Sequence, residues 1–504
     1  MITLRKREIY LLIFFIGVIC AAYFIWMGEE YRSLLSTAAT VQELPDPSPA
    51  TASVHSSMAY PVFPATDTTL YQMGLYLDIS DRTLYGSTIL QTKNTAGQAL
   101  NDLWFTVYPN AFRDAKTTPA PAEAYYAGFN EGWMEVEECQ VNDKPVEFFL
   151  EGVSLQLIME QDIMPEADIK IELKWQARIP KLAYRYGSKD GVFMLGNFYP
   201  TLNVLDEDGW HNSYNSVFGD PFCFNTADYL LRINIPEAYD IASTGINTQT
   251  IAEDNGRETY IVEAKNVRDF CLLVMYDYNE LREKANSTTL KAYFPGGGDE
   301  TVSRIIKKSG EILNYYSCKW GSYPYQDFKV AFVPMKGFHG MEYSGLIFLR
   351  EEFLQPDFDQ ERSDFILAHE IAHQWWYGMV GNDQLREPWL DEGLANWSAY
   401  KYLEAYGGKA PVDRGTEPEV NLARELRDIY SSSDYYLTAY SGGEAFWFGL
   451  EKELGEENID KVLRRYLADY RFKIAATQDL LTVIKKEAHK DMDDYFAKWF
   501  GPRK

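Results

Sequence analysis

Five consecutive residues, H-E-I-A-H at positions 369–373, carry the clearest chemical pattern in this sequence. On an α-helix each residue advances about 100°, so His373 lies about 40° around the axis from His369 and one turn further along. Both imidazoles can therefore bind one metal ion, and Glu370 lies near enough to act on a water at that ion. The sequence has six histidines, so this pattern arises by chance in about one such chain in a hundred. We infer a metal site on a helix.

A carboxylate that can complete this site follows in the sequence W-L-D-E-G-L-A at residues 389–395. Glu392 comes after 18 intervening residues and lies near the start of a second predicted helix. Two His and one Glu hold zinc and leave a fourth position open for water, as a catalytic zinc site requires. Zinc polarises a carbonyl and makes water more acidic, and Glu370 is placed to take the proton and pass it to a leaving amine. The pattern predicts a zinc peptidase.

These motifs resemble those of the aminopeptidase N family of gluzincin zinc metallopeptidases, which includes membrane alanyl aminopeptidases and leukotriene-hydrolase-like enzymes. In that family the third ligand also follows after 18 residues, in a W-L-N-E-G-[FL]-A block, and the second His begins H-Q-W-W, as it does here. The resemblance implies one zinc ion per chain, held by His369, His373 and Glu392, with Glu370 as general base. Asp391 departs from the family, which has Asn there.

A second motif points to an exopeptidase. The sequence H-G-M-E-Y at residues 339–343 is similar to the family's G-[AG]-M-E-[NY], whose Glu binds the free α-amine of the substrate. The resemblance gives this role to Glu342, and an ammonium group in a closed cleft needs a fixed carboxylate partner. His339 departs from the family's Gly.

A third motif supplies a hydrogen-bond donor. The sequence Y-S-G-G-E-A at residues 440–445 is similar to the family's Y-x-K-G-A, whose Tyr donates to the tetrahedral oxyanion. The resemblance gives this role to Tyr440, because a phenol is a neutral, directional donor at pH 7. Gly442 replaces the family's Lys, and Tyr435 and Tyr436 lie nearby as alternatives.

The chain has 504 residues, which is too many for one ordinary hydrophobic core. The periodicity of its apolar residues divides it into two regions, and these must position the motifs. Residues 61–294 alternate short apolar runs with Gly, Asn and Asp turns, which predicts a large antiparallel β domain. Residues 295–504 begin as mixed α/β and become mainly helical. We therefore expect an α+β multidomain protein. Helices are expected near 299–318, 365–380, 390–405, 440–455 and 458–470, and a strand at 328–333.

The resemblance identifies the first region as a β-saddle domain and the second as a thermolysin-like zinc peptidase catalytic domain. It also implies a short form that lacks the C-terminal helical domain of longer members.

The N-terminal residues predict a membrane anchor. Residues 9–27 are uncharged and nearly all apolar, and about 1.5 Å per residue makes this run long enough to cross a bilayer. Basic residues 5–7 before the run favour a cytoplasmic N-terminus, residues 1–8, with the catalytic domain extracytoplasmic in a single-pass arrangement at the cell membrane. Residues 28–60 read as a flexible linker. A cleaved signal peptide is the alternative.

Charge and cysteine content exclude other classes. The formal net charge is −26, from 48 basic and 74 acidic side chains, and no basic run is longer than the three residues 5–7, so we expect no nucleic-acid partner. The five cysteines include no C-x-x-C pair, which excludes a cysteine zinc knuckle. The expected partners are peptide substrates and, through residues 9–27, the membrane.

Two other functions are compatible with the same residues. The protein is a zinc endopeptidase if Glu342 does not face the cleft. It is a peptide-binding receptor or sensor if the peptidase-like region only binds peptides. The departures from the family motifs at residues 339, 391 and 442 are compatible with this alternative. The intact metal ligands and Glu370 favour an enzyme, because binding alone needs no general base.

Overall fold

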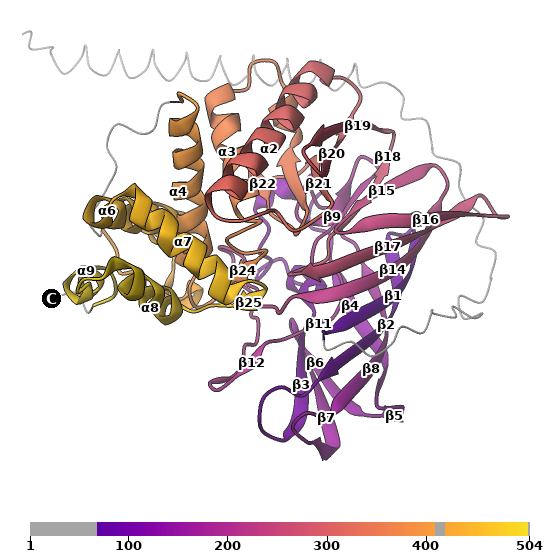
Figure 1. Cartoon of the computed structure of the whole chain (residues 1–504). Helices are drawn as coiled ribbons and strands as arrows, with labels where there is room; N and C mark the ends of the chain where they lie inside the picture. Colours follow the sequence, from indigo (N-terminus) through magenta and orange to yellow (C-terminus); the bar gives the residue numbers. More distant parts are fainter. Residues whose placement is uncertain (1–67, 409–418, 502–504) are drawn as a thin grey trace, which may run out of the picture. The chain divides into compact units, whose positions relative to one another are not determined.

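The structure is a computed structural model and describes residues 68–408 and 419–501 (Figure 1). The predicted N-terminal tail, membrane helix and linker, residues 1–60, lie outside the described residues. Within the described ranges, no helix is both long and apolar enough to cross a lipid bilayer.

The first region is built from strands joined mainly by turns, as the period-two alternation predicts. In β8 the residues Ile169, Ile171, Leu173 and Trp175 are buried, and the polar residues between them lie on the other face. The strands of this region are β1 (Leu70–Asp78), β2 (Thr83–Lys93), β3 (Leu100–Thr106), β4 (Trp133–Val141), β5 (Lys144–Pro145), β6 (Glu147–Glu151), β7 (Ser154–Ile163), β8 (Asp168–Arg178), β9 (Tyr186–Lys189), β10 (Val192–Leu195), β11 (Thr201–Leu202), β12 (Leu205–Asp206), β13 (Gly209–Trp210), β14 (Ala227–Pro236), β15 (Tyr239–Ser243), β16 (Ile246–Glu253), β17 (Arg257–Val267) and β18 (Leu272–Tyr276). Short 3-10 helices η1 (Tyr108–Phe112) and η2 (Ala122–Ala124) interrupt them.

One large sheet forms the body of this region, with the strand order β16-β17-β14-β1-β2-β8-β4-β5. Its pairs are antiparallel with one exception, since β1 runs parallel to β14 with Leu70 opposite Asp228. The predicted β domain is therefore confirmed, but not as a purely antiparallel sheet. Parallel neighbours need a long crossover, and a long stretch of chain separates β1 from β14. Two four-stranded sheets, β15-β18-β10-β9 and β11-β3-β7-β6, and the two-stranded sheet β12-β13 complete the region.

The second region combines a mixed sheet with helices, which lie on the left of Figure 1. Its strands are β19 (Tyr278–Ala285), β20 (Thr288–Pro295), β21 (Asp327–Val333), β22 (Gly340–Met341), β23 (Leu346–Arg350), β24 (Val380–Gly381) and β25 (Lys473–Ile474). Its helices are α2 (Asp299–Lys319), η3 (Glu351–Leu354), α3 (Gln360–Ala372), α4 (Trp389–Ala405), η4 (Leu426–Asp428), α5 (Ser432–Tyr435), η5 (Tyr436–Gly442), α6 (Gly443–Leu454), α7 (Glu456–Tyr470), α8 (Thr477–Ala488) and α9 (Asp493–Phe500).

Sheet pairing differs from the predicted division of the chain at residues 294/295. The five-stranded sheet has the order β19-β20-β21-β23-β22, so β20 pairs with β21 beyond the predicted boundary and β19 joins the same sheet through β20. Sequence periodicity cannot reveal this, because the alternation of β19 and β20 continues that of the preceding β region. The strand β22 lies at the edge of this sheet.

The expected helices are present, but two of them differ from the prediction. The helix α3 ends at Ala372, with His373 as its C-cap, and does not continue to residue 380. Tyr377 has φ of 144°, in a region that helices do not use. Its hydroxyl donates to Asp269 over 2.7 Å, and its carbonyl accepts from Arg268, which holds this conformation in place. The helix expected at 440–455 begins as the π-helix η5 before continuing as α6.

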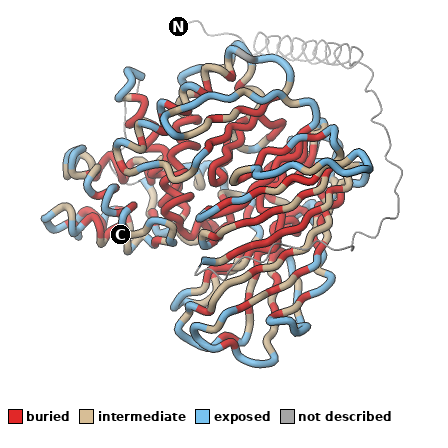
Figure 2. The backbone as a smooth tube through the Cα atoms, turned by 45° about the vertical axis from the view of Figure 1, so that its right-hand side comes forward, coloured by how far each residue is buried: buried red, intermediate tan, exposed pale blue. Residues whose placement is uncertain are grey.

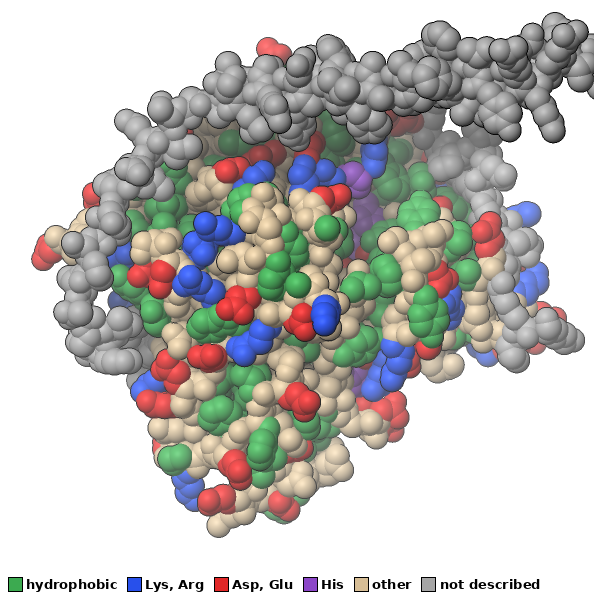
Figure 3. Space-filling model, turned by 180° about the vertical axis from the view of Figure 1, so that it is seen from behind, with side chains coloured by type: hydrophobic (Ala, Val, Ile, Leu, Met, Phe, Trp, Pro, Cys, Tyr) green, Lys and Arg blue, Asp and Glu red, His purple; other side chains and the backbone are tan. Residues whose placement is uncertain are grey.

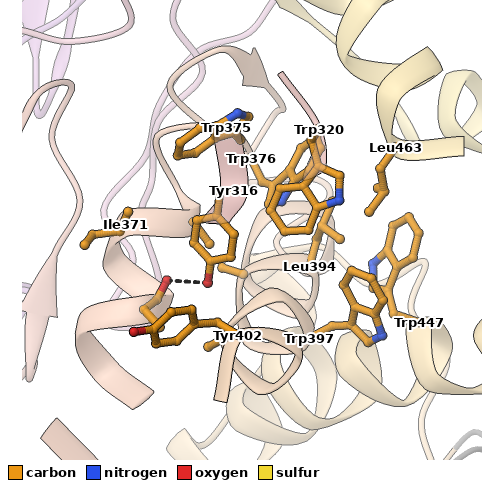
Figure 4. Packing of buried hydrophobic residues seen from close by; sticks show 14 of the residues in the cluster. Tyr316, Trp320, Ile371, Trp375, Trp376, Leu394, Trp397, Tyr402, Trp447 and Leu463 are labelled. Atoms are coloured by element: carbon orange, nitrogen blue, oxygen red, sulfur yellow. Dashed lines mark hydrogen bonds between the residues drawn. The ribbon is translucent and has the colours of Figure 1, made fainter. Parts of the chain in front are cut away.

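Buried aromatic side chains hold α3 and α4 against the neighbouring helices (Figure 4). Tyr316 of α2 donates from its hydroxyl to the carbonyl of Ala368 in α3 over 3.0 Å. Its ring stacks on Trp320 with centroids 4.8 Å apart. Trp397 of α4 packs 6.0 Å from Trp447 of α6, measured between ring centroids. Figure 2 shows the middle of the sheets and the central helices as buried, so the two helices that carry the metal motif lie on a rigid core.

Candidate functional site

The structure brings the three predicted metal ligands together on α3 and α4. Nε2 of His369 lies 3.0 Å from Nε2 of His373. Oε2 of Glu392 lies 3.2 Å from the first of these nitrogens and 3.4 Å from the second. Ligands held about 2.0–2.2 Å from a tetrahedral zinc lie roughly 3.3–3.6 Å from one another. The three atoms therefore already have close to the separation that a zinc ion requires.

The unpaired atoms at this cluster also fit a metal ion. Oε2 of Glu392 is buried and has no hydrogen-bond partner within the described ranges. Nδ1 of His373 lies 3.1 Å from the carbonyl oxygen of Trp376 and donates to it, so the lone pair of Nε2 faces the cluster. This second contact orients a metal-binding imidazole in the usual way. The donor set of two imidazoles and one carboxylate fits zinc.

Asp391, which replaces the family's Asn, has a defined structural role next to Glu392. Its Oδ2 accepts a hydrogen bond from Nε2 of Gln384 over 2.7 Å, and its Oδ1 accepts from Nδ2 of Asn382 over 3.2 Å. A carboxylate suits position 391 because its two oxygens accept hydrogen bonds from two side-chain amides. The pair of bonds fixes the first turn of α4, which carries Glu392.

Glu370 lies at the same cluster, buried against the edge strand β22. A Cβ atom on Gly340 would be only 2.2 Å from Oε1 of Glu370, so the carboxylate packs directly on the backbone of that strand. Its Oε2 has no hydrogen-bond partner in the part of the chain that the structure describes. Burial raises the pKa of Glu370 above its ordinary value. The carboxylate is free to bind and to accept a proton.

Glu342 immediately follows β22 and lines the same cleft as Glu370. Its side chain is buried, and burial together with the nearby carboxylate of Asp220 raises the pKa of Glu342. Gln374, the residue after His373, ties this segment to the end of α3. Its Nε2 donates to the carbonyl of Tyr343 over 3.1 Å, and its Oε1 accepts from the N–H of Gly345 over 2.8 Å.

Tyr440 projects from η5 onto the metal cluster. Its hydroxyl donates to Oε1 of Glu392 over 2.6 Å, and its ring centroid lies 5.9 Å from that of His369. The hydroxyl of Tyr435 is 3.5 Å from the same carboxylate oxygen. Tyr436 stacks on Tyr440 and is 54% exposed. Geometry therefore favours Tyr440 over its two neighbours.

A contact between two glycines sets the distance from Tyr440 to Glu392. Gly393 of α4 and Gly443 of α6 meet so closely that a Cβ on Gly393 would be 2.4 Å from Cα of Gly443. Only glycine permits such a backbone approach. The contact fixes the spacing of the helices directly beside the two functional side chains.

Asp220 of the β region reaches this site, and sequence reasoning missed both this residue and its partner Arg185. Asp220 lines the cleft beside Glu342, and it forms a buried ion pair with Arg185. The guanidinium of Arg185 also lies 4.4 Å from the ring centroid of Phe338. Asp220 belongs to the G-D-P-F sequence at residues 219–222. The only signal in the sequence is an Asp followed by Pro in an aromatic segment. The neighbouring residues do not show which way the Asp220 side chain points.

The cleft that contains these residues has a volume of about 810 Å³ and is lined from both regions. Figure 3 shows histidine side chains deep in a hollow of the face seen there. Apolar walls of the cleft come from Pro119, Pro121, Tyr184, Phe338 and Met341. The arrangement joins a zinc-binding cluster, a free carboxylate and a phenol donor in one peptide-sized hollow.

Residues 305–499 match the peptidase family M1 domain. Aminopeptidase M1-B of Oryza sativa subsp. japonica is 27% identical over 295 residues, which is 53% of this chain and 32% of the rice protein. Probable aminopeptidase 1 of Sulfurisphaera tokodaii is 22% identical over 403 residues, 73% of this chain and 48% of that protein. The chain thus spans about a third of the length of the rice relative, and about half that of the archaeal one.

Solved structures show the same fold over most of the chain. The M1 zinc metallopeptidase from Deinococcus radiodurans superposes with a TM-score of 0.63 at 17% sequence identity, covering 86% of this chain and 94% of that one. A mutant of that metallopeptidase bound to a Tyr-Ser-Ala substrate gives a TM-score of 0.63 at 16% identity, covering 87% and 95%.

Proposed function

We propose that this chain, which belongs to the aminopeptidase N family of zinc metallopeptidases (peptidase family M1), removes N-terminal residues from peptides. The observation that carries the proposal is the position of Glu342. Its carboxylate opens onto the same cleft as Glu370 and two of the three metal ligands, His369 and Glu392. A fixed carboxylate there recognises the free α-amine and places the first peptide bond at the metal cluster.

His369, His373 and Glu392 hold the zinc ion, which supplies a Lewis acid for the scissile carbonyl and makes water more acidic. Glu370 takes the proton of the attacking water and delivers it to the leaving amine, because its unpaired Oε2 is free for this. The Tyr440 hydroxyl turns from Glu392 to the oxyanion as negative charge develops there. Glu342 holds the α-ammonium group throughout.

The test uses the full-length chain loaded with zinc and a panel of aminoacyl fluorogenic amides with their N-acetylated counterparts. We expect cleavage of the free-amine substrates only. Glu370→Gln provides the blank, because it removes the proton acceptor and keeps the shape of the side chain. Cleavage of the acetylated substrates would show an endopeptidase in which Glu342 does not select the amine. No cleavage by a zinc-loaded chain would favour the peptide-binding receptor or sensor.

We also propose that residues 9–27 anchor the chain in the cell membrane as a single helix, with the catalytic region extracytoplasmic. The uncharged apolar run and the basic residues 5–7 before it support this arrangement. Membranes that contain the full-length chain are washed with alkaline carbonate, and intact cells are treated separately with protease from outside. A retained anchor keeps the intact chain in the membrane pellet and exposes the catalytic region to the protease. Release of a chain shortened at its N-terminus would show a cleaved signal peptide.

A further inference from the structure

A single basic side chain lies in an otherwise acidic cleft. Of the described residues that line it, Arg362 is the only Arg or Lys, whereas Glu123, Asp220 and Glu342 are acidic residues outside the metal cluster. Arg362 belongs to the first turn of α3, two turns before His369. Because the other charged residues outside the metal cluster are acidic, Arg362 is the favourable place for a negatively charged ligand group away from that cluster.

The guanidinium of Arg362 has free hydrogen-bonding capacity. Its Nη2 lies 2.7 Å from Nε2 of His339. Burial, with the positive charges of Arg362 and Arg350 nearby, lowers the pKa of His339 to about 4, so this imidazole is neutral and accepts the bond. No carboxylate of the described residues forms an ion pair with Arg362. The charge is therefore held in position by a neutral partner and is not neutralised.

The direction of the edge strand β22 (Gly340–Met341) places Arg362 on the leaving-group side of the scissile bond. Glu342, the proposed amine site, follows the strand, and Glu370 packs against Gly340. His339 precedes the strand, so it lies beyond Glu370 as seen from Glu342. An extended peptide adds to such an edge at about 3.3 Å per residue. With its first residue at Glu342, its third residue comes level with Gly340, and a carboxyl group that follows this residue lies next to His339.

We propose that Arg362, oriented by His339, forms a subsite for a carboxylate on the leaving-group side of the scissile bond. This inference rests on the proposed aminopeptidase function and names the substrates that the cleft favours. They are peptides that carry a carboxylate at about the third residue. The group is either the terminal carboxylate of a tripeptide or the side chain of an acidic residue in a longer peptide. A guanidinium suits both, because its planar fork binds a carboxylate with two hydrogen bonds.

The test measures kcat/KM of the full-length zinc enzyme for two matched pairs of peptides. Leu-Gly-Gly is compared with Leu-Gly-Gly-amide, which lacks the terminal charge. Leu-Gly-Asp-amide is compared with Leu-Gly-Asn-amide, which has the same shape without the side-chain charge. We expect the charged member of at least one pair to be favoured by about tenfold or more, as charge-assisted hydrogen bonds provide. The pair that shows the preference identifies the source of the carboxylate.

Variants then assign the preference to Arg362. Arg362→Gln is expected to bring the ratio within the pair to about one, and His339→Gly to reduce it, because the guanidinium loses its orienting contact. Arg465→Gln is the matched control and keeps the wild-type ratio. It removes the same charge from an exposed arginine on α7 that pairs with Asp469, so it tests for long-range electrostatic effects.

Two results would overturn the subsite. One is a ratio near one for both pairs in the wild-type enzyme, and the other is an unchanged ratio in Arg362→Gln. Cleavage of the uncharged amide peptides reports the aminopeptidase activity separately. A chain that cleaves these amides without any charge preference refutes the subsite alone. A chain that cleaves none of the four peptides refutes the proposed function together with the subsite.

Discussion

The contact between Gly393 and Gly443 makes a quantitative prediction for Gly393→Ala. The new Cβ would lie 2.4 Å from Cα of Gly443 and 2.6 Å from its carbonyl carbon. Carbon atoms in contact prefer about 3.5–4.0 Å, so α4 and α6 must separate locally by about 1 Å. Both groups in the contact are backbone, and no side chain can rotate away. Overpacking of this kind destabilises by about 1–3 kcal/mol.

The same displacement acts on catalysis, because Glu392 precedes Gly393 and Tyr440 lies one turn before Gly443. The 2.6 Å contact between the Tyr440 hydroxyl and Oε1 of Glu392 spans the two helices. A misplacement of about 1 Å in a catalytic group can lower the rate about 100-fold. We therefore expect kcat of Gly393→Ala to fall by roughly two orders of magnitude, together with a lower unfolding temperature.

The assay combines kcat on an aminoacyl fluorogenic amide with thermal unfolding and zinc analysis. Gly296→Ala is the matched control, because Gly296 has no atom within 4 Å of a built Cβ and its φ is not positive. Wild-type kcat and unfolding temperature in Gly393→Ala would refute the reasoning, since they would show that the helices can separate without effect. A loss of zinc without a loss of stability would place the effect on Glu392 alone.

Three further predictions concern single side chains. Tyr440→Phe should lower kcat by about 10²–10³-fold with little change in KM or zinc content, because its bond to the substrate forms in the transition state; steady-state kinetics with an unchanged kcat would transfer the role to Tyr435. Burial lowers the pKa of His211, but its contacts of 2.6 Å with Asp383 and Asp206 outweigh burial and raise the pKa above its ordinary value. The resulting stabilisation is complete below about pH 6.5 and is lost as pH rises through the raised pKa. His211→Asn should therefore lower the unfolding temperature most at acidic pH. A decrease in unfolding temperature that does not depend on pH would contradict this. Arg185→Met leaves Asp220 buried and unpaired and should cost about 3–5 kcal/mol; denaturant unfolding of Arg185→Met/Asp220→Asn should show a smaller loss than the sum of the single variants, and additive losses would show that the pair does not interact.

Secondary structure followed from the sequence where the pattern was local and long. The alternation in β8 and the apolar face of α7 are properties of consecutive residues, so the strands and helices appear where the periodicity places them. Prediction failed where a distant contact decided the outcome. Periodicity continued past residue 373, whereas Asp269 and Arg268 of the β region hold Tyr377 in a conformation that a helix cannot continue through. The pairing of β20 with β21 is another case.

The residues of the metal cluster could be predicted from the sequence, because helix geometry alone brings His369, Glu370 and His373 onto neighbouring positions. To predict Glu392 as the third ligand, it was enough to expect a second helix after a short connection. Sequence order, however, says nothing about how far α4 lies from α6, so the distance between Glu392 and Tyr440 depends on packing. The departures at residues 339 and 391 were visible, but their meaning depends on Arg362 and on two amides that reach Asp391.

By itself the sequence determined the residue types that make a zinc peptidase and their order along the chain, because those depend on local spacing. Tertiary structure decided whether the other side chains share the cleft. Asp220 comes from the β region, Glu342 from a sheet edge, Arg362 from the first turn of α3, and Tyr440 from a π-helix. These residues meet because buried aromatic rings and the Gly393–Gly443 contact fix the distances between elements. Such distances result from packing over the whole molecule, which no local pattern encodes.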